Sequence, residues 1–589
     1  MLSALLWLPA LGAAVVGFLP GKMNGMRLRS IASAFALAVF LLNIWLLTQF
    51  DPANSGLQFQ EYLPWIPQLG LSYNLGIDGL SLPLLVLSAL LTLLVIYGTG
   101  EAVARPQLYY ALILLINAGI AGALMSQNLL LFVLFYEIEL IPFYLLIAIW
   151  GGKQREYAAM KFLIYTAVSG LLVLAGFLGV ALLSGSRNFD YSAIHTQDLS
   201  FNTQLILLTI VLLGFAIKIP LVPLHTWLPD AYVEASPATA ILLGGILAKL
   251  GTYGLVRFGL QLFPETWSII APGLAIIGTV SVMYGALSAI AQKDIKRMVA
   301  YSSIGHMGYI LVACAAGTKL ALIGAVGQMV SHGLILALLF YLVGVIESKV
   351  GTRDLDVLNG LMNPMRGLPT ASSLLVLGGM ASAGIPGLVG FIAEFLVFQG
   401  SFSSFPIPTL ICILASGLTA VYFVILLNRT CFGKLDNATA YYPAVTFGEN
   451  MPALVLAGII FVLGIQPAWL LKWSESTTNA IAATLPTDRN AQVAISYPWS
   501  NSAIEISSTH QENSAIEIAS THQENSAIEI SSTHQENSAI EISSTHQENS
   551  AIEIASTHQE NSAIEIASTH QENSAIEIAS TQTKSASAD

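Results

Sequence analysis

Long apolar runs separated by short polar connections fill most of this chain. A helix needs about 20 consecutive apolar residues to cross roughly 30 Å of hydrocarbon. Fourteen segments satisfy this requirement, so we predict an all-α integral membrane protein. The predicted spans cover residues 2–20, 28–49, 80–98, 107–126, 128–150, 157–184, 203–224, 236–260, 269–291, 297–316, 320–347, 370–400, 406–428 and 451–473.

The connections between these spans form two sets that differ in positive charge. If the spans alternate from an outside N-terminus, one set holds fourteen Lys and Arg residues and the other holds five. Positive residues concentrate in cytoplasmic loops, so we expect both termini on the lumenal or periplasmic side. The connection from Asp51 to Gly79 has no Lys or Arg, which places it on that side too.

From Asn501 onward the chain repeats near-identical copies of the twelve residues NSAIEISSTHQE. A helix advances about 100° per residue, so these copies would form no continuous apolar stripe. Two Ile per copy also offer strands little core. We therefore predict a transmembrane domain over 1–480, and a linker with a disordered, low-complexity tail over 481–589.

Composition supports a membrane protein and assigns the net charge to the tail. The chain is 55% apolar and 10% charged, with mean hydropathy +0.70 and net charge −12, whereas soluble domains are about 25% charged. From Asn501 onward, thirteen Glu, one Asp and one Lys give a net of −13. The charge therefore indicates no cationic partner. Cys314, Cys412 and Cys431 stand singly, without metal-ligand spacing.

Several ionisable residues fall within or beside the predicted spans. Each costs about 2.5–3.5 kcal/mol at a helix centre by insertion scales, so such residues pair or line water and are candidates for function. Lys161 can instead reach the headgroups. The histidines are either relay residues or ordinary core residues. The set is Glu137, Glu139, Lys161, Lys218, Lys249 and Glu394, with His306 and His332.

Three of these charges lie near residues that interrupt helices. Pro220 has no amide hydrogen, so the helix that carries Lys218 is expected to end there. Glycines flank Lys249, and the segment GMASAGIPGLVGFIAEF places Gly and Pro ahead of Glu394. Interrupted helices in the two halves of a transporter indicate an ion path at the membrane midplane.

Lysine and glutamate together can move protons. A lysine keeps its proton in water, whereas burial makes the charged form costly and a nearby carboxylate stabilises it again. A lysine whose glutamate partner approaches and withdraws can therefore be loaded with a proton and stripped of it.

Four segments resemble one family of membrane proteins. The resemblance is to the antiporter-like proton-pumping subunits of respiratory complex I, subunit 4 (chain M or D) in particular, over about residues 70–475. It implies fourteen transmembrane helices with two inverted five-helix repeats, about 107–260 and 269–428, and broken helices at spans 7 and 12. The segments are FYEIELIPFYLLIAIWGG, FAIKIPLVPLHTWLPDAYVEASPATAILLGGILAKLGTYGLVRF, AQKDIKRMVAYSSIGHMGY and AGIPGLVGFIAEF.

The resemblance also implies roles for individual residues. Glu137 looks like the span 5 glutamate and Lys218 like its span 7 lysine partner. Lys249 is similar to the central span 8 lysine, and Glu394 to the span 12 acid that faces the exit half-channel. For Glu139, a partner-facing role and a structural role both stay open.

In that family, partner subunits perform the redox chemistry. The resemblance implies NAD(P)H or ferredoxin, iron–sulfur clusters and quinone in those partners, which include sister antiporter-like subunits. This sequence has no flavin site, no iron–sulfur cysteine spacing and no Rossmann glycine motif. We therefore expect no cofactor, no metal and no nucleic acid bound to this chain.

Other segments point to a cyanobacterial relative. EIELIP and WGGKQREYAAMKF look cyanobacterial or plastid, which implies a thylakoid or plasma membrane and plastoquinone as acceptor. VYFVILLNRTCFGKLDN is similar to variants from complexes that energise carbon dioxide uptake.

Two other functions stay open at this point. A subunit of a multi-subunit cation/proton antiporter would share the Lys218 and Lys249 motifs, although glutamate at 394 favours the complex I type. A noncatalytic membrane scaffold would not need Lys249 at all.

Overall fold

The computed structural model describes two compact units, Met1–Asn490 and Ala491–Asp589. In the first unit it describes residues 1–19, 23–100, 103–186, 188–364, 367–433 and 441–486. In the second it describes the backbone of strand segments between 504 and 580.

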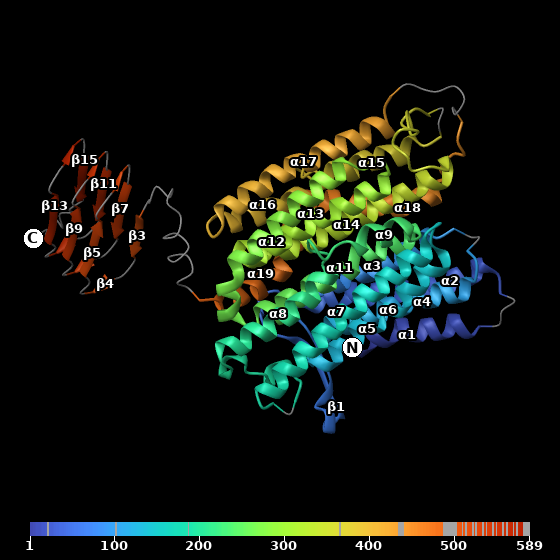
Figure 1. Cartoon of the computed structure of the whole chain (residues 1–589), viewed down its shortest axis with the longest axis horizontal. Coiled ribbons are helices and arrows are strands. Elements are labelled where there is room, and N and C mark those ends of the chain that lie inside the picture. Colours follow the sequence, from blue (N-terminus) through green and yellow to red (C-terminus); the bar gives the residue numbers. More distant parts are fainter. Residues whose placement is uncertain are drawn as a thin grey trace, which may run out of the picture. The chain divides into compact units, whose positions relative to one another are not determined.

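Apolar helices build the first unit and run largely side by side (Figure 1). Within the described ranges, eleven helices are long and apolar enough to cross a membrane, and three shorter apolar helices accompany them. Every predicted span is occupied by helix. The first eight helices are α1 (Leu2–Phe18), α2 (Gly25–Gln49), α3 (Leu82–Gly98), α4 (Pro106–Met125), α5 (Leu129–Ile138), α6 (Leu140–Trp150), α7 (Arg155–Leu183) and α8 (Phe201–Lys218).

The remaining helices include two breaks, one at the end of the predicted span 203–224 and one within the predicted span 370–400. α8 and α9 are separated by a break, and so are α15 and α16, at the two positions where Pro and Gly predict interruption. The helices are α9 (Trp227–Glu234), α10 (Pro237–Leu242), α11 (Ala248–Gly254), α12 (Pro264–Ile290), α13 (Ile295–Ala316), α14 (Lys319–Val350), α15 (Pro369–Ser382), α16 (Val389–Phe402), α17 (Pro406–Thr430), α18 (Phe447–Ile465) and α19 (Ala468–Ala483).

The span from Pro237 to Leu260 is not a uniform α-helix. Two π-helical segments, η4 (Leu243–Leu247) and η5 (Leu255–Leu260), lie on either side of α11. A π turn accommodates one more residue than an α turn and is frequent at functional sites. All residues of η4, α11 and η5 are buried.

A β-hairpin occupies the connection before α3, where the sequence predicts only a loop. Strands β1 (Gln58–Ile66) and β2 (Leu71–Ile77) pair antiparallel, joined by the short helix η1 (Pro67–Leu69). Gly70 closes the turn at φ 65°, a backbone conformation that suits glycine. Two more short helices, η2 (Tyr191–Ala193) and η3 (Thr196–Asp198), precede α8.

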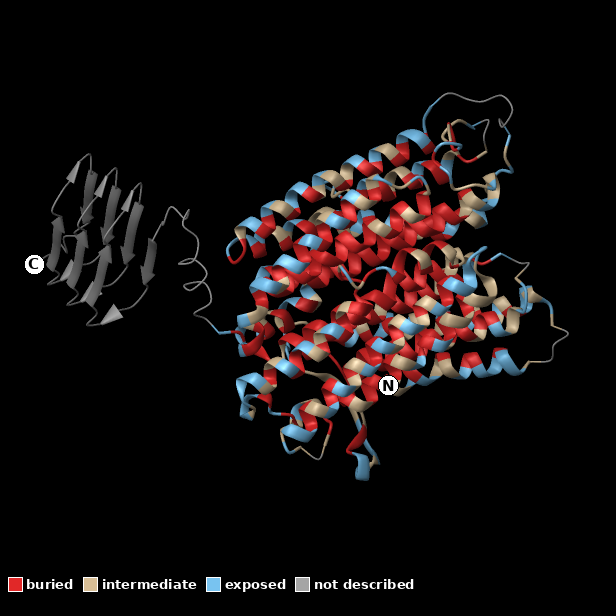
Figure 2. Cartoon of the chain, in the orientation of Figure 1, coloured by how far each residue is buried: buried red, intermediate tan, exposed pale blue. Residues whose placement is uncertain are grey.

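Burial within the first unit follows the expectation for a membrane bundle (Figure 2). Inner faces are buried, whereas large apolar side chains stay exposed on outer helices. Leu171 on α7 is 66% exposed and Leu414 on α17 is 63% exposed. Extended exposed apolar surfaces are rare on soluble monomers, so these faces are suited to lipid.

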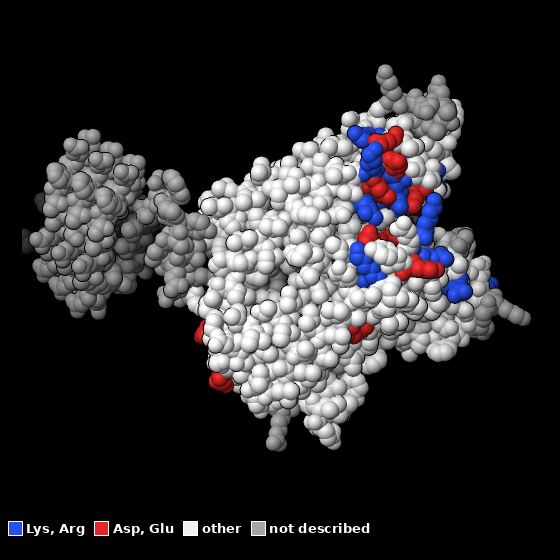
Figure 3. All heavy atoms as spheres, in the orientation of Figure 1, with Lys and Arg blue, Asp and Glu red and all other residues white. Residues whose placement is uncertain are grey.

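Charged side chains gather at one end of the first unit (Figure 3). Arg353 lies 3.2 Å from Asp294, and Lys349 lies 2.8 Å from Glu449. The described basic residues of these ion pairs come from connections that the sequence assigns to one side of the membrane. We call this region the charged end.

The described segments of the second unit are strands, whereas the sequence predicts a disordered tail. Strands pair in parallel with the strand two copies away, as in Ile504 with Ile528 and Ile516 with Ile540. Ala-Ile-Glu-Ile alternation suits a strand, and pairing over two copies aligns equivalent positions of the repeat. The strands are β3 (Ile504–Ser508), β4 (Gln511–Glu512), β5 (Ala515–Ser520), β6 (Gln523–Glu524), β7 (Ala527–Ser532), β8 (Gln535–Glu536), β9 (Ala539–Ser544), β10 (Gln547–Glu548), β11 (Ala551–Ser556), β12 (Gln559–Glu560), β13 (Ala563–Ser568), β14 (Gln571–Glu572) and β15 (Ala575–Ser580).

Candidate functional site

The break after α8 holds Lys218 at the last residue of that helix. Because Pro220 cannot donate a hydrogen bond, the regular ladder stops and nearby carbonyls need other donors. The indole nitrogen of Trp227 donates to the carbonyl of Ile217 at 2.8 Å. The predicted interruption is therefore confirmed, and α9 closes it.

Lys218 forms its ion pair with Glu139. The distance between Lys218 Nζ and Glu139 Oε1 is 2.7 Å, and the side chains are 3% and 0% exposed. Lys218 Nζ also donates to the carbonyl of Tyr136 at 3.2 Å. The resemblance points instead to Glu137 as the partner, so the observed pairing differs from that expectation. α5 ends at Ile138, and the turn that follows directs Glu139 toward α8.

Glu137 lies against α7 instead. A Cβ atom on Gly170 would lie only 1.8 Å from Glu137 Oε1, so the carboxylate occupies the space that glycine leaves. Among the described residues this buried oxygen has no hydrogen-bond partner. A buried carboxylate oxygen without a protein donor calls for water or a proton.

Lys249 lies at the centre of the bundle and is 1% exposed. Its Nζ donates to the carbonyl of Gly244 at 2.5 Å and lies 2.8 Å from His332 Nδ1. Gly244 precedes Lys249 by five residues, so the π segment η4 places this carbonyl within reach of the amine.

Two histidines extend this contact to Glu394. The rings of His332 and His306 lie 5.1 Å apart between centroids. His306 Nδ1 lies 3.4 Å from Glu394 Oε1, and Ser416 Oγ donates to Glu394 Oε2 at 2.8 Å. Lys249, His332, His306 and Glu394, four of the predicted site residues, therefore form one contact series.

The second helix break makes room for Glu394. Gly384 has φ 70° and Gly387 has φ 91°, both in the left-handed region that favours glycine. A Cβ atom on Gly384 would also lie 3.0 Å from Glu394 Oε2. Ser382, the last residue of α15, lies with its Oγ 3.0 Å from His306 Nε2. The predicted break before Glu394 is confirmed.

The Lys218 pair and the Lys249 series remain two separate groups. Within the described part of the chain, no hydrogen bond or ion pair joins Lys218 to Lys249. Their helices meet at Gly251, two residues after Lys249, where a Cβ atom would lie 3.4 Å from Lys218 Cβ. A proton crossing this gap needs water or a movement of a side chain.

Lys161 forms an ion pair at the charged end. Its Nζ lies 2.8 Å from Asp230 Oδ2, and Arg297 Nη2 lies 3.3 Å from Asp230 Oδ1. Asp230 on α9 therefore joins α7 to α13 at the charged end.

A second buried ion pair escapes the sequence reasoning. Arg257 Nη2 donates to Asp78 Oδ2, and both side chains are nearly inaccessible. Gln261 Oε1 accepts from Arg257 Nη1 at 3.0 Å. The sequence did contain a signal for this pair. Asp78 precedes the predicted span 80–98 and Arg257 lies near the end of the predicted span 236–260, so their opposite charges fall on the same side of the membrane.

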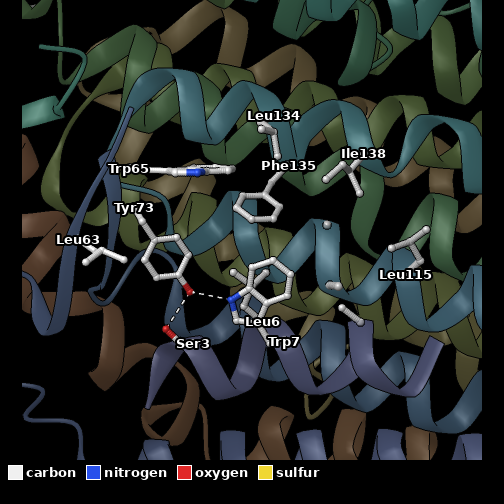
Figure 4. A pocket seen from close by; sticks show the side chains of 13 residues that line it. Ser3, Leu6, Trp7, Leu63, Trp65, Tyr73, Leu115, Leu134, Phe135 and Ile138 are labelled. Carbon is white, nitrogen blue, oxygen red and sulfur yellow. Dashed lines mark hydrogen bonds between the residues drawn. The ribbon is translucent and has the colours of Figure 1, made fainter. Parts of the chain in front are cut away.

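An apolar cavity of about 500 Å³ is lined by α1, α4, α5 and the β1–β2 hairpin (Figure 4). Its polar edge consists of Tyr73, whose hydroxyl lies 2.8 Å from Ser3 Oγ and 3.2 Å from Trp7 Nε1. None of the candidate relay residues lines it. The cavity is therefore distinct from the site.

Comparisons with known proteins agree with this architecture. The family described as NADH:quinone oxidoreductase/Mrp antiporter, TM, matches residues 126–419, which include every candidate site residue. NAD(P)H-quinone oxidoreductase chain 4 of Acaryochloris marina (strain MBIC 11017) is 37% identical over 524 residues, covering 87% of this chain and 98% of the relative. The protein of the same name from Prochlorococcus marinus (strain NATL2A) is 40% identical over 447 residues, covering 74% and 82%.

Solved structures with the same fold come from multi-subunit complexes. A chain of respiratory complex I from Thermus thermophilus with bound NADH has TM-score 0.75 and 28% identity, covering 82% of this chain and 100% of that chain. A chain of the Mrp complex from Dietzia sp. DQ12-45-1b has TM-score 0.74 and 22% identity, covering 84% and 99%. The resemblance read from the motifs is confirmed, and the chain belongs to the NAD(P)H-quinone oxidoreductase chain 4 family of multi-pass membrane proteins.

Proposed function

We propose that this chain is the proton-translocating membrane subunit of a complex I-type NAD(P)H- or ferredoxin-plastoquinone oxidoreductase. The family to which it belongs supports the type of complex. The observation that carries the proposal is the buried contact series from Lys249 through His332 and His306 to Glu394.

In this proposal the Lys218–Glu139 pair acts as the loading step. A closed pair stabilises the protonated amine, and an open pair leaves a buried cation without its counter-charge. Breaking a buried pair changes the free energy by about 3–5 kcal/mol. Moving one charge against 100 mV requires about 2.3 kcal/mol, so opening the pair can drive a proton onward.

Lys249 acts as the central acceptor and donor. Its amine donates to Gly244 and faces His332 Nδ1, so a proton given up by Lys249 has an imidazole nitrogen as its acceptor. Imidazole can accept on one nitrogen and donate from the other. The proton passes by way of His306 to Glu394, the predicted exit acid.

Glu137 has a supporting place in this scheme. Glu137 is two residues from Glu139 in the sequence, but its carboxylate faces Gly170. We assign it the role of a proton acceptor that exchanges with Lys218 when the pair opens.

Redox chemistry belongs to partner subunits in this proposal. These are hydrophilic subunits with NAD(P)H or ferredoxin sites and iron–sulfur clusters, a quinone site, and sister antiporter-like membrane subunits. In the described part of the chain, no group of three or more His, Cys, Asp and Glu residues could hold a metal ion. We assign proton movement to this chain and the redox centres to those partners.

We further propose a cyanobacterial thylakoid or plasma membrane, with the charged end facing the cytoplasm and both termini on the lumenal or periplasmic side. Relatives from cyanobacteria support the source, and the basic connections support the orientation. A role in a carbon dioxide uptake complex stays a prediction from sequence.

Lys249→Ala in the complete membrane complex tests the proposal. We expect redox-linked proton translocation to be lost while the complex still assembles, because the variant removes the central amine but little else. Lys293→Ala, an exposed cation outside the bundle, is the matched control. Full translocation in Lys249→Ala would favour the scaffold function instead.

The antiporter alternative needs a separate measurement. Quinone-site inhibitors stop proton translocation if it is driven by quinone reduction. Cation-driven proton exchange by this chain that persists with such inhibitors would favour an antiporter subunit.

A further inference from the structure

The strands of the second unit stack into a column (Figure 1). Long strands build two of its sheets, in the orders β15-β11-β7-β3 and β13-β9-β5. Short Gln-Glu strands build two more, in the orders β14-β10-β6 and β12-β8-β4. Each strand pairs in parallel with the strand two repeat copies away, as in Ile552 with Ile576. One turn of the column therefore consists of two copies of the repeat.

The long strands at both ends of the column have an open edge. Within the described segments, β3 and β5 at one end and β13 and β15 at the other have a neighbour on one side only. An edge strand presents unpaired backbone groups to which another chain can bond, and natural edges are often protected by Lys, Pro or a bulge. β15 has the sequence AIEIAS and pairs with β11 without a register shift, so it carries none of these protections.

The end strands have the same sequence as the inner strands. Columns of repeats usually end in distinct capping repeats. Here β15 is identical to β11, and β3 has the same five residues, IEISS, as the end of β7. A strand that fits beside an inner strand therefore fits equally well on an open edge. Another copy of this repeat unit supplies such strands.

A second copy matches the open end in two sheets at once. β13 and β15 come from consecutive repeats, and so do β3 and β5. The second copy can therefore pair its β3 with β13 and its β5 with β15. Continuing the inner register aligns Ile564 with Ile504 of the second copy, and Ile576 with its Ile516. One end of a copy meets the opposite end of the next, so the contact is head-to-tail.

We infer that the repeat unit joins this chain to a second copy of itself by adding the edge strands of one column to those of the next. Backbone hydrogen bonds between added strands provide the affinity. Because a head-to-tail contact leaves an open edge at each outer end, it can continue and connect the membrane complexes in rows. The inference uses none of the relay residues and is independent of the proposed function.

The charge of the repeat opposes this contact and gives it a recognisable dependence on salt. Parallel pairing aligns Glu553 with Glu577 inside the column. The proposed contact aligns Glu577 with Glu517 of the second copy. Like charges at directly opposite positions are destabilising, and each tail carries a net charge of −13. Salt screens exposed charges, so we expect the association of the natural chain to strengthen as salt is added.

Sedimentation velocity of the complete, detergent-purified complex tests the association. We expect the natural complex to associate reversibly with concentration, and more strongly at higher salt. The complex whose copy of this chain lacks residues 491–589 should stay single under the same conditions. Equal association with and without these residues would show that another surface joins the complexes.

Charge reversal at one end of the column tests the register of the contact. Glu565→Lys with Glu577→Lys places lysine opposite glutamate both across the contact and within the copy. We expect the Kd at low salt to fall about tenfold, and added salt now to weaken the association. Adding Glu505→Lys and Glu517→Lys to the same chain restores like charges across the contact, so the Kd should rise again by about tenfold.

Glu529→Lys with Glu541→Lys is the matched control. It changes the net charge by the same amount but lies in β7 and β9, which are inner strands. Its Kd should stay close to that of the natural chain.

Two results would overturn the inference. One is a natural complex and a Glu565→Lys/Glu577→Lys complex that both stay single at every concentration and salt. The other is an equal Kd for the end variant and the inner control. Neither result bears on proton translocation, which Lys249→Ala tests separately.

Discussion

Lys218 on α8 and Glu139 after α5 form a buried ion pair with 2.7 Å between Nζ and Oε1. The pair connects the first helix break to a turn between two other helices, and it excludes the neighbouring Glu137. The two glutamates, two residues apart, therefore have different surroundings.

Glu139→Gln should damage the protein more than Glu137→Gln. Removing the Glu139 charge leaves Lys218 buried without its partner, which typically costs about 3–5 kcal/mol. We expect less assembled complex and slower proton translocation in Glu139→Gln, measured on native gels and in vesicles. If Glu139→Gln assembles and translocates protons almost normally while Glu137→Gln is inactive, Glu137 would be the functional partner of Lys218.

Gly170→Ala should reproduce part of the Glu137→Gln effect without changing a charge. The added methyl would meet the Glu137 carboxylate at 1.8 Å and must displace it. We expect reduced translocation by assembled complex. Gly273→Ala on α12 is the control, because a Cβ atom there meets nothing within 4 Å. Equal activity of the two variants would show that the Glu137 position is unimportant.

Gly384→Ala should destabilise the second helix break. Its φ of 70° disfavours alanine, and the methyl would approach Glu394 Oε2 at 3.0 Å. The cost is about 1–2 kcal/mol, which thermal denaturation of the purified complex would detect as a lower transition temperature. Gly417→Ala within α17 is the control, since its Cβ atom would enter open space. An unchanged transition temperature in Gly384→Ala would contradict the described geometry.

The ion pairs of the charged end should lose strength in acid. Hydrogen bonding by Lys293, with Arg429 nearby, holds the pKa of Asp356 below its usual value, and Asp356 raises the pKa of Lys293. A carboxyl with a lowered pKa contributes stability above its unfolded value and loses it as pH falls through the folded value. A lysine with a raised pKa stabilises the fold below its unfolded pKa. It loses this stabilisation as pH rises through its folded pKa.

Hydrogen exchange in residues 352–358, corrected for intrinsic rates, measures this dependence. We expect constant protection from about pH 5 to 9 and weaker protection below about pH 4. Asp356→Asn should abolish the acid-dependent step. Protection that changes around neutral pH would show that other groups control this segment.

Deleting residues 491–589 should leave proton translocation intact. All candidate relay residues belong to the first unit, which forms its own compact set of contacts. Assembly and translocation of the shortened chain, compared with the full chain, provide the test. Loss of translocation with normal assembly would assign the repeat unit a part in pumping.

The sequence predicts the spans well because hydrocarbon thickness sets their length. It also locates both helix breaks, since Pro220 and Gly384 impose backbone constraints that depend on few neighbours. The contact series from Lys249 to Glu394 agrees with the expected candidates because buried charges are costly and therefore few. These features depend on local chemistry and on the membrane.

Other features depend on tertiary geometry and could not be predicted from the sequence. Spacing along the chain alone does not decide whether Glu137 or Glu139 meets Lys218, because a turn at the end of α5 reorients the second glutamate. The β1–β2 hairpin has uneven apolar alternation and a register shift near Pro64, which hides it. In the tail, counting Ile per copy misses the pairing of strands two copies apart.

The π segments of the span from Pro237 to Leu260 change how its surfaces must be drawn. Each inserted residue rotates everything beyond it by about 100° relative to an uninterrupted helix. A single helical wheel for this span would therefore place Lys249 and Arg257 wrongly relative to the residues before η4. Spin labels or cross-linkers could be attached at residues on the two sides of η4 or η5. The distances they report should differ from those of a regular α-helix.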